Sequence, residues 1–418
     1  MGDITCLADG FVQSVDFNET GLNANELVVG PTGSGKSFSN AYSRLLHTTE
    51  SSVVVPIAKG AIKNKFYNMF VKRGYDVIDL NFADMDSSEC GYDPFDYIKT
   101  DEDILQVSDR IIQSSSKDML GNNDPYWSGA AKTTTAAIMS CTIQYAKDSN
   151  KKPCFADFLE LHRSVKIEER NGRFYTSIDK YFQELEIRHP GNQASEWWKT
   201  IHGLSSKTAS CVWSIVNYAL ADINSEAVSN ITRRKKRIVL KDIGKKKTAL
   251  FITTSPFNKA TNKFVNIMYG DLFRELFNEA ESNEDYKLKI PVHIICDDFA
   301  CTSKIEGFAD YISIFRAAGI SVTMLLQSET QLTNMYGETD ATTIINNCDT
   351  YVYLGGMDNK TCENVSKRAN VPLKTIAEMP LEQVYVFRRG WKCFKGRRYQ
   401  TLNDSEYIKL FEKEHVYG

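Results

Sequence analysis

Short runs of consecutive apolar residues alternate with longer amphipathic stretches over the first hundred residues. Such runs cover 26–30, 52–57 and 75–80, and Lys59–Arg73 carries apolar residues at helical spacing. Runs of that length are typical of strands buried on both faces, and a helix between two such strands is typical of a parallel sheet. We therefore expect residues 1–100 to begin a parallel-sheet core.

Residues 101–235 show helical spacing of apolar residues and no convincing strand. The segments with this spacing are 101–116, 127–148, 155–165, 178–188 and 207–228. Because apolar residues that recur every three or four positions indicate amphipathic helices, we expect an inserted all-α domain over 101–235.

Strand patterns return after residue 235. They cover 238–240, 248–254, 292–297, 321–326, 350–354 and 384–387, and helical stretches such as 263–282 separate most of them. The pattern therefore predicts an α/β fold in which residues 1–100 and 236–418 form one parallel-sheet core, interrupted by the helical insert.

Composition changes this picture little, but it excludes several classes of protein. The chain has 418 residues, of which 42% are hydrophobic and 25% charged, and these fractions are ordinary for a globular protein. A net charge of −3 excludes a uniformly basic nucleic-acid binder, although it allows a local basic patch. The ten cysteines include no CxxC pair, so neither a zinc site nor a disulfide framework is expected. We find no signal peptide and no run of about 18 apolar residues, and therefore expect no membrane-spanning segment.

A phosphate-binding motif follows the first strand directly. The pattern G-x-x-x-x-G-K-[ST] is matched in full by Gly30, Pro31, Thr32, Gly33, Ser34, Gly35, Lys36 and Ser37. Glycines let the backbone wrap around phosphates, with its N–H groups pointing inward at the start of a helix. Lys36 is expected to reach the β- and γ-phosphates of ATP, and the Ser37 hydroxyl to ligate Mg²⁺. The motif therefore predicts a P-loop ATPase.

Two adjacent carboxylates end the apolar run at 292–297. Asp297 is expected to hold Mg²⁺, and Asp298 to activate the attacking water as a general base. Acidic pairs are common at the ends of strands, so a solvated turn is the alternative. The P-loop upstream favours the catalytic interpretation.

Further motifs, in the same order along the chain, resemble those of TraG-type coupling proteins of type IV secretion and conjugation, in the FtsK/HerA-like motor superfamily. They are Lys59-Gly60, Gly91–Asp96, Asn123–Trp127, Ile243–Phe251, Asp298–Ala300, Leu325–Ser328, Asn347–Thr350 and Leu354–Gly356. The resemblance implies a RecA/FtsK-like P-loop NTPase core with ATP and Mg²⁺ as cofactors. It also implies that the helical insert recognises substrate proteins.

The same resemblance implies roles for two further residues. Gln327 matches a glutamine at a strand end that senses the γ-phosphate. Arg316 matches an arginine finger that reaches the γ-phosphate of a neighbouring subunit, which would make hydrolysis depend on assembly. From the residues alone, a surface amide at 327 and an exposed helix charge at 316 are the alternatives.

The chain departs from the family pattern in two respects. Asp298 stands where the family usually has Glu. A side chain shorter by one methylene retracts the carboxylate by roughly 1 Å, so either slow hydrolysis or a site rearranged to suit Asp is expected. The usual members also carry N-terminal transmembrane helices, whereas only about 24 residues precede the first strand pattern here. Either the sequence is trimmed, or this member docks on a separate membrane partner, which the start at Met1 favours.

Three basic stretches are candidates for contact with single-stranded DNA. They are Arg233–Arg237, Lys245–Lys247 and Arg388–Tyr399, and the last interleaves cations with aromatic residues. Cations neutralise phosphates, and exposed aromatic rings can stack on bases. A solvated rim, or a hairpin edge protected by charge, is the alternative for each stretch.

The resemblance implies an ATP-driven coupling protein, hexameric when active, that recruits a relaxase with single-stranded DNA and drives DNA transfer. A membrane-channel or membrane-anchor protein would be a further partner. The expected location is cytoplasmic, peripheral at the inner face of the bacterial cell membrane. Two alternatives stay open: a nucleotide-gated adaptor with little hydrolysis, which Asp298 keeps possible, and a soluble HerA-like DNA translocase in repair or defence.

Overall fold

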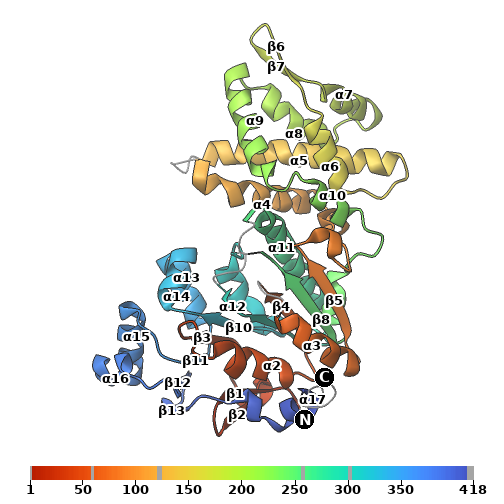
Figure 1. Cartoon of the computed structure of the whole chain (residues 1–418). Helices are drawn as coiled ribbons and strands as arrows, with labels where there is room; N and C mark the ends of the chain where they lie inside the picture. Colours follow the sequence, from red (N-terminus) through yellow and green to blue (C-terminus); the bar gives the residue numbers. More distant parts are fainter. Residues whose placement is uncertain (1, 58–60, 120–124, 256–258, 300–303, 412–418) are drawn as a thin grey trace. The chain divides into compact units, whose positions relative to one another are not determined.

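A computed structural model describes residues 2–57, 61–119, 125–255, 259–299 and 304–411 (Figure 1). The chain divides into two compact units. The first comprises Met1–Asn81, Val239–Phe257 and Leu272–Gly418, and the second comprises Phe82–Ile238 and Asn258–Asp271. The second unit therefore begins earlier and ends later in the sequence than the insert expected at 101–235. The division of the chain into domains at those expected bounds stays a prediction.

The first unit is built on a nine-stranded sheet with the order β13-β12-β11-β3-β10-β9-β4-β8-β5. All neighbours from β11 to β5 are parallel, whereas β12 runs antiparallel to both of its neighbours. The strands are β3 (Glu26–Val29), β4 (Ser52–Ile57), β5 (Asp76–Asn81), β8 (Thr248–Thr253), β9 (Val292–Cys296), β10 (Ile320–Leu326), β11 (Thr350–Tyr353), β12 (Gln383–Arg388) and β13 (Phe394–Arg397). The expected α/β fold with a parallel-sheet core is thus confirmed.

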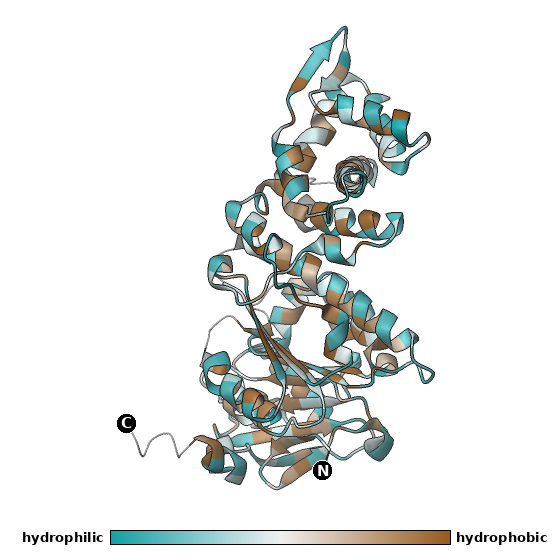
Figure 2. Cartoon of the chain, turned by 90° about the vertical axis from the view of Figure 1, so that its right-hand side faces the viewer, coloured by the Kyte–Doolittle hydropathy of each residue, from teal (hydrophilic) through white to brown (hydrophobic). Residues whose placement is uncertain are grey.

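The central strands are buried along their whole length, which explains their unbroken apolar runs. Every residue of β3, β4 and β9 is buried, as expected for strands with helices on both faces. Helix α3 (Ala61–Lys72) contributes Phe66 and Phe70 to a core that also holds Val53 and Phe251. The strands are accordingly coloured largely as hydrophobic in Figure 2.

The remaining helices of this unit lie between its strands in sequence or after the last of them, singly or in consecutive pairs. They are α1 (Phe17–Thr20), α2 (Ser43–Leu46), α12 (Phe308–Ala318), α13 (Glu329–Tyr336), α14 (Glu338–Asn346), α15 (Asn359–Ala369), α16 (Leu373–Ala377) and α17 (Ser405–Phe411). Helix α11 (Lys259–Glu281) contributes residues to both units. None of the described helices is long and apolar enough to cross a membrane.

An N-terminal hairpin, β1 (Ile4–Ala8) and β2 (Phe11–Ser14), was not predicted from the sequence. Asp3 anchors it, because its carboxylate accepts hydrogen bonds from the backbone N–H groups of Thr49, Glu50 and Ser51 at 2.6, 2.8 and 2.9 Å. These hydrogen bonds outweigh the effect of burial and lower the pKa of Asp3. The hairpin is therefore fastened to the segment that precedes β4.

The second unit is mostly helical. It contains α4 (Asp101–Met119), α5 (Pro125–Asp148), α6 (Phe155–Arg163), α7 (Asp179–Arg188), α8 (Gln193–His202), α9 (Ser206–Ala221) and α10 (Glu226–Thr232). The expectation of an insert without strands is wrong, because β6 (Ile167–Arg170) and β7 (Arg173–Thr176) form an antiparallel hairpin. Its turn is Asn171-Gly172, with φ of 52° and 72°. Asn-Gly is a strong hairpin signal that the search for apolar runs overlooks, since β6 is exposed at every position.

Two smaller expectations are also wrong. Residues 238–240 do not form a strand: the described chain there makes an isolated bridge between Gly91 and Arg237 and then a 3₁₀ turn, η4 (Leu240–Gly244). The helical pattern over 207–228 covers two helices, because Ser225 caps α10 by accepting a hydrogen bond from the N–H of Val228.

Candidate active site

The P-loop connects the end of β3 to a helical segment. A π-helical turn, η1 (Ser37–Tyr42), follows the loop and continues into α2. Gly30 is required by close packing, because a Cβ there would lie 2.6 Å from Ser34 Oγ and 2.9 Å from Leu354 Cβ. Gly35 has φ of +85°, a conformation that favours glycine. The motif thus occupies the strand–loop–helix setting that its sequence predicts.

Lys36 lies in the loop with its charge facing backbone oxygens. Its Nζ donates hydrogen bonds to the carbonyl oxygens of Gly30 at 2.6 Å and Pro31 at 3.0 Å, and the residue is 6% exposed. A buried ammonium group held by hydrogen bonds places a fixed positive charge inside the loop. Such a charge suits the binding of phosphate.

Ser37 and Asp297, far apart in sequence, are in direct contact. Ser37 Oγ lies 2.8 Å from Asp297 Oδ1 and 3.0 Å from Oδ2. Burial and the neighbouring Asp298 raise the pKa of Asp297, while Ser37 and Lys36 lower it, and the net shift is upward. A hydroxyl and a carboxylate are the hard oxygen donors that Mg²⁺ prefers, so this pair fits a magnesium ion.

Asp298, the second predicted acid, has an unusual backbone conformation. Its φ is +54°, in the left-handed region, where Asp and Asn are enriched among residues other than glycine. The next residue, Phe299, is 1% exposed, and its ring lies 5.3 Å from that of Phe308 and 6.0 Å from that of Tyr336. The anchored ring fixes the turn that carries the acidic pair.

The order of the strands places Gln327 beside the P-loop and the acidic pair. Strand β10 lies between β3 and β9, and the N–H of Gly30 donates to the carbonyl oxygen of Leu326 at 3.0 Å. The backbone N–H of Gln327 donates to Gln331 Oε1 at 3.0 Å. The structure therefore brings the P-loop, Asp297, Asp298 and Gln327 together at the carboxyl edge of the sheet, the usual place for ligands in open α/β sheets.

Arg316 lies apart from the other predicted residues. It is in the last turn of α12, just before β10, and its guanidinium carbon lies 4.9 Å from the centre of the Phe17 ring. Together with Pro291 and Ser321 it lines a cavity of about 570 Å³ at the amino edge of the sheet. Since the seven residues of β10 span roughly 23 Å, Arg316 is too far from the P-loop of its own chain to act there.

The comparison with known proteins assigns the chain to a family. A family model described as "Type IV secretory system Conjugative DNA transfer" matches residues 5–370. The chain belongs to this family. No curated protein matches it in sequence.

Solved structures of conjugation and secretion proteins share the fold. The bacterial conjugative coupling protein TrwBdeltaN70, in a trigonal form with sulphate, is 21% identical over 90% of this chain and 85% of that one, with a TM-score of 0.66. TrwB in complex with ADP and Mg²⁺ has the same identity and coverage and a TM-score of 0.65. VirB4 of Thermoanaerobacter pseudethanolicus is 12% identical over 98% of both chains, with a TM-score of 0.60. At these identities the likeness establishes the P-loop NTPase fold.

Some motif residues that suggested the family from sequence lie outside the described residues. They are Lys59, Gly60, Asn123, Asp124 and Ala300.

The element at 91–96 is described, and its role is structural. Asp93, which is fully buried, accepts a hydrogen bond from the N–H of Phe95 at 2.9 Å and lies 3.4 Å from Arg237 Nη1. Burial raises the pKa of Asp93 to about 6.

Two of the three basic stretches of this family member are engaged in internal contacts. Arg233 binds the carboxylates of Asp157 and Glu160. Arg234 donates to the carbonyl oxygens of Met85 and Asp86, and Arg237 pairs with Asp93 and Asp96. Lys245, Lys246 and Lys247 pair with Glu279, Asp76 and Glu50 at 3.0, 2.7 and 2.9 Å. Carboxylates thus neutralise Arg233, Arg237 and the three lysines, whereas Arg234 binds only carbonyl groups, and Lys235 and Lys236 have no acidic partner among the described residues.

The third stretch differs in this respect. It forms the β12–β13 hairpin, in which Arg389 pairs with Asp349 at 2.7 Å. Among the described residues, Lys392, Lys395 and Arg397 have no acidic partner. Trp391 is 57% exposed at the turn. The hairpin therefore presents unpaired cations beside an exposed aromatic ring.

One residue of this stretch, Arg398, reaches the P-loop instead of the surface of the hairpin. Its Nη1 donates to the carbonyl oxygen of Ser34 at 2.5 Å. The sequence marked Arg398 only as part of a basic run, because no local pattern shows that residues 364 positions apart meet.

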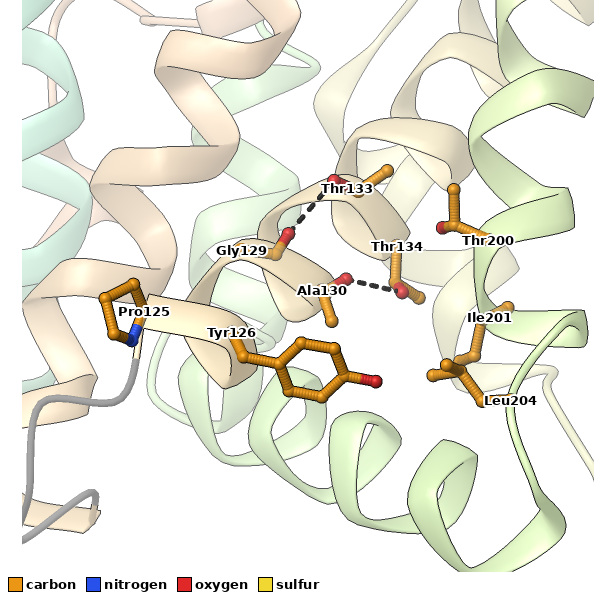
Figure 3. Close-up of a pocket in the computed structure, with 9 residues that line it drawn as sticks. All are labelled: Pro125, Tyr126, Gly129, Ala130, Thr133, Thr134, Thr200, Ile201 and Leu204. Atoms are coloured by element: carbon orange, nitrogen blue, oxygen red, sulfur yellow. Dashed lines mark hydrogen bonds between the residues drawn. The ribbon is translucent and has the colours of Figure 1, made fainter.

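A separate pocket of about 330 Å³ lies in the second unit (Figure 3). It is lined by Pro125, Tyr126, Gly129, Ala130, Thr133 and Thr134 of α5, and by Thr200, Ile201 and Leu204. The hydroxyl groups of Thr133 and Thr134 donate to carbonyl oxygens of their own helix at 2.9 and 2.8 Å. The lining therefore offers mainly apolar surface, and it includes none of the predicted site residues.

Proposed function

We propose that this chain is an ATP-driven coupling protein of a type IV secretion or conjugation system, which recruits a relaxase bound to single-stranded DNA and drives DNA transfer. The observation that carries the proposal is the meeting of Ser37 and Asp297, at 2.8 Å, beside a complete P-loop. Membership of the conjugative DNA transfer family and the fold shared with TrwB, which has been solved with ADP and Mg²⁺, support it.

Each site residue has a role in this proposal. Lys36 and the N–H groups of Gly30–Ser37 bind the phosphates of ATP, and Ser37 with Asp297 holds Mg²⁺. The ion, when bound, neutralises charge on the phosphates. Asp298 accepts a proton from the attacking water, and Gln327, next to the P-loop strand, responds to the γ-phosphate.

The position of Arg316 supports an active form with more than one copy of the chain. Its guanidinium cannot reach the P-loop of its own chain, but in a head-to-tail ring the amino edge of one copy can approach the nucleotide of the next. We propose that Arg316 acts in this way, as an arginine finger, in a hexamer.

The DNA-contacting element in this proposal is the β12–β13 hairpin. Lys392, Lys395 and Arg397 have no acidic partner among the described residues and can neutralise phosphates. The Trp391 ring is 57% exposed, although it lies 5.3 Å from the Arg388 guanidinium carbon, and its exposed part can stack on a base. Further partners in the proposal are the relaxase and a membrane-channel or membrane-anchor protein. The complex would form in the cytoplasm, at the inner face of the bacterial cell membrane.

A nucleotide-gated adaptor with little hydrolysis is the second candidate. The observation that favours it is the short carboxylate of Asp298 on a left-handed backbone, because small displacements of a general base slow a reaction strongly. Such a protein would bind ATP, change its assembly and hold cargo without continuous turnover.

Mixing two inactive variants tests the proposed site between subunits. Lys36→Ala removes the P-loop lysine and Arg316→Ala removes the finger, so each variant alone is expected to lack turnover. In an equal mixture about a quarter of head-to-tail interfaces combine an intact P-loop with an intact finger, so activity should return. ATP turnover of the two variants, alone and mixed, is the measurement.

Two controls define the outcome. Lys287→Ala, which removes another cation lining the same cavity as Arg316, should keep full turnover. Mixing Lys36→Ala with the double variant should restore nothing. If the first mixture stays inactive while wild-type protein turns over ATP, Arg316 does not complete a neighbour's site.

A further inference from the structure

The C-terminal segment of the first unit contacts the P-loop directly. Arg398 follows β13, and its Nη1 donates to the Ser34 carbonyl oxygen at 2.5 Å. A Cβ on Gly35 would lie 2.7 Å from that same nitrogen. The guanidinium group therefore occupies the space beside Gly35 in which any other residue would place a side chain.

Arg398 carries a charge that is not neutralised within the described residues. It forms no ion pair there, in contrast to the arginines of the 233–237 run, which bind carboxylates or carbonyl groups. A guanidinium group has five N–H donors, and its contact with Ser34 uses one nitrogen. A half-buried, unpaired cation against a phosphate-binding loop fits an anionic ligand.

Neighbouring contacts hold the segment in place. The Thr401 hydroxyl, in a residue that is 1% exposed, donates to the carbonyl oxygen of Phe38 in the turn after the P-loop. Asp404 binds His47 Nε2 at 2.8 Å and also accepts from the Tyr399 hydroxyl. Arg398 is therefore carried on a segment that is attached to both ends of the P-loop helix.

We propose that Arg398 is a positioning residue of the nucleotide site, supplied by the C-terminal segment of the same chain. It holds the P-loop through the Ser34 carbonyl group and adds a positive charge beside the phosphate chain of the nucleotide. Arg398 lies beyond residues 5–370, which match the family model. The proposal rests on the proposed function, because it assumes that the P-loop binds ATP.

The test is the affinity of the full chain for ATP with Mg²⁺, measured by calorimetry at low and high KCl. Arg398→Gln keeps a hydrogen-bond donor but removes the charge, and Arg398→Lys keeps the charge. Lys409→Gln removes a cation from an exposed side chain further along the same C-terminal segment, and is the matched control. We expect Arg398→Gln to bind ATP about tenfold more weakly and with less dependence on salt. Arg398→Lys should recover most of the affinity, and Lys409→Gln should bind as the wild type does.

Several results would overturn the proposal. One is an affinity of Arg398→Gln for ATP equal to that of the wild type. Another is an equal loss of ATP affinity in Arg398→Gln and Arg398→Lys with unchanged salt dependence, because that result would mark a purely structural residue. The melting temperature without nucleotide shows whether each variant folds. If Arg398→Gln does not fold, Arg398→Lys decides, because the proposal requires near-wild-type affinity and salt dependence there. If the wild type itself binds no ATP, the proposed function fails instead, so the two failures are distinguishable.

Discussion

At the scale of single residues, the conformation of Asp298 is tied to its identity. A left-handed backbone is tolerated by Asp and Asn better than by most residues, because their short polar side chains can hydrogen-bond locally. An Asp at this position thus suits the turn between β9 and Phe299. The same turn sets how far the carboxylate reaches.

The proposed catalytic role of Asp298 can be separated from its structural role. Asp298→Asn keeps the shape and the left-handed preference but cannot accept a proton. We expect ATP affinity and melting temperature to stay near wild type while turnover falls at least about 100-fold, the usual contribution of a general base. Asp298→Glu should fold with a lower melting temperature, because Glu favours this conformation less. Undiminished turnover in Asp298→Asn would remove Asp298 from the mechanism.

The raised pKa of Asp297 predicts a pH dependence of metal binding. Burial and Asp298 favour the protonated form, and only the carboxylate binds Mg²⁺ well. As pH falls below neutrality, affinity for Mg·ATP should therefore decline at a higher pH than an ordinary Asp would cause. Calorimetry across this range is the measurement. Asp297→Asn is the control, because its remaining pH dependence belongs to ATP itself; identical profiles in both proteins would contradict the prediction.

At the scale of elements, the sequence predicted the buried strands of the sheet, including those that carry the site, and missed the strands of the small hairpins and the edge strand β13. β3, β9 and β10 are mostly apolar, and the residues that follow them supply, in that order, the P-loop, Asp297 and Gln327. Their positions can be predicted because burial on both faces leaves a strong local pattern.

Other features could not be predicted because they depend on contacts between distant residues. In the hairpin β6–β7, every residue of β6 is exposed and only Phe174 and Thr176 of β7 are buried, so the Asn171-Gly172 turn is its clearest local signal. The charge run 233–237 gave no sign that its arginines would meet carboxylates such as Asp93. Likewise, no spacing shows that Arg398 contacts the P-loop.

Because Arg237 contacts Asp93, substitutions of different arginines within the 233–237 run should lower the free energy of unfolding by different amounts. Arg237→Ala leaves a fully buried carboxylate without its cation, which should cost about 3 kcal/mol of the free energy of unfolding. Because burial raises the pKa of Asp93 to about 6, the loss should be largest above that pH and shrink below it, as protonation removes the charge.

Urea denaturation at several pH values is the measurement. Arg233→Ala is the matched control, because Arg233 pairs with two exposed carboxylates and should cost less than about 1 kcal/mol. Equal losses in the two variants, or a loss in Arg237→Ala that does not depend on pH, would show that Arg237 does not neutralise Asp93.

At the scale of the whole molecule, the residues of the proposed site lie at two opposite edges of one sheet. The P-loop, the acidic pair and Gln327 lie at the carboxyl edge, and Arg316 lies at the amino edge beside a cavity. A single chain therefore holds both parts of the proposed site without joining them. Turnover should then depend on how many copies have assembled.

The measurement that tests this account most directly is ATP turnover of the purified chain over a range of protein concentrations, with and without single-stranded DNA. We expect turnover per chain to rise with concentration and with DNA, because both favour assembly, and to vanish in Lys36→Ala. Removing the hairpin cations, in Lys392→Gln with Lys395→Gln, should abolish the stimulation by DNA and leave the basal rate. Tight ATP binding without turnover at any concentration, with or without DNA, would contradict the motor and leave the nucleotide-gated adaptor.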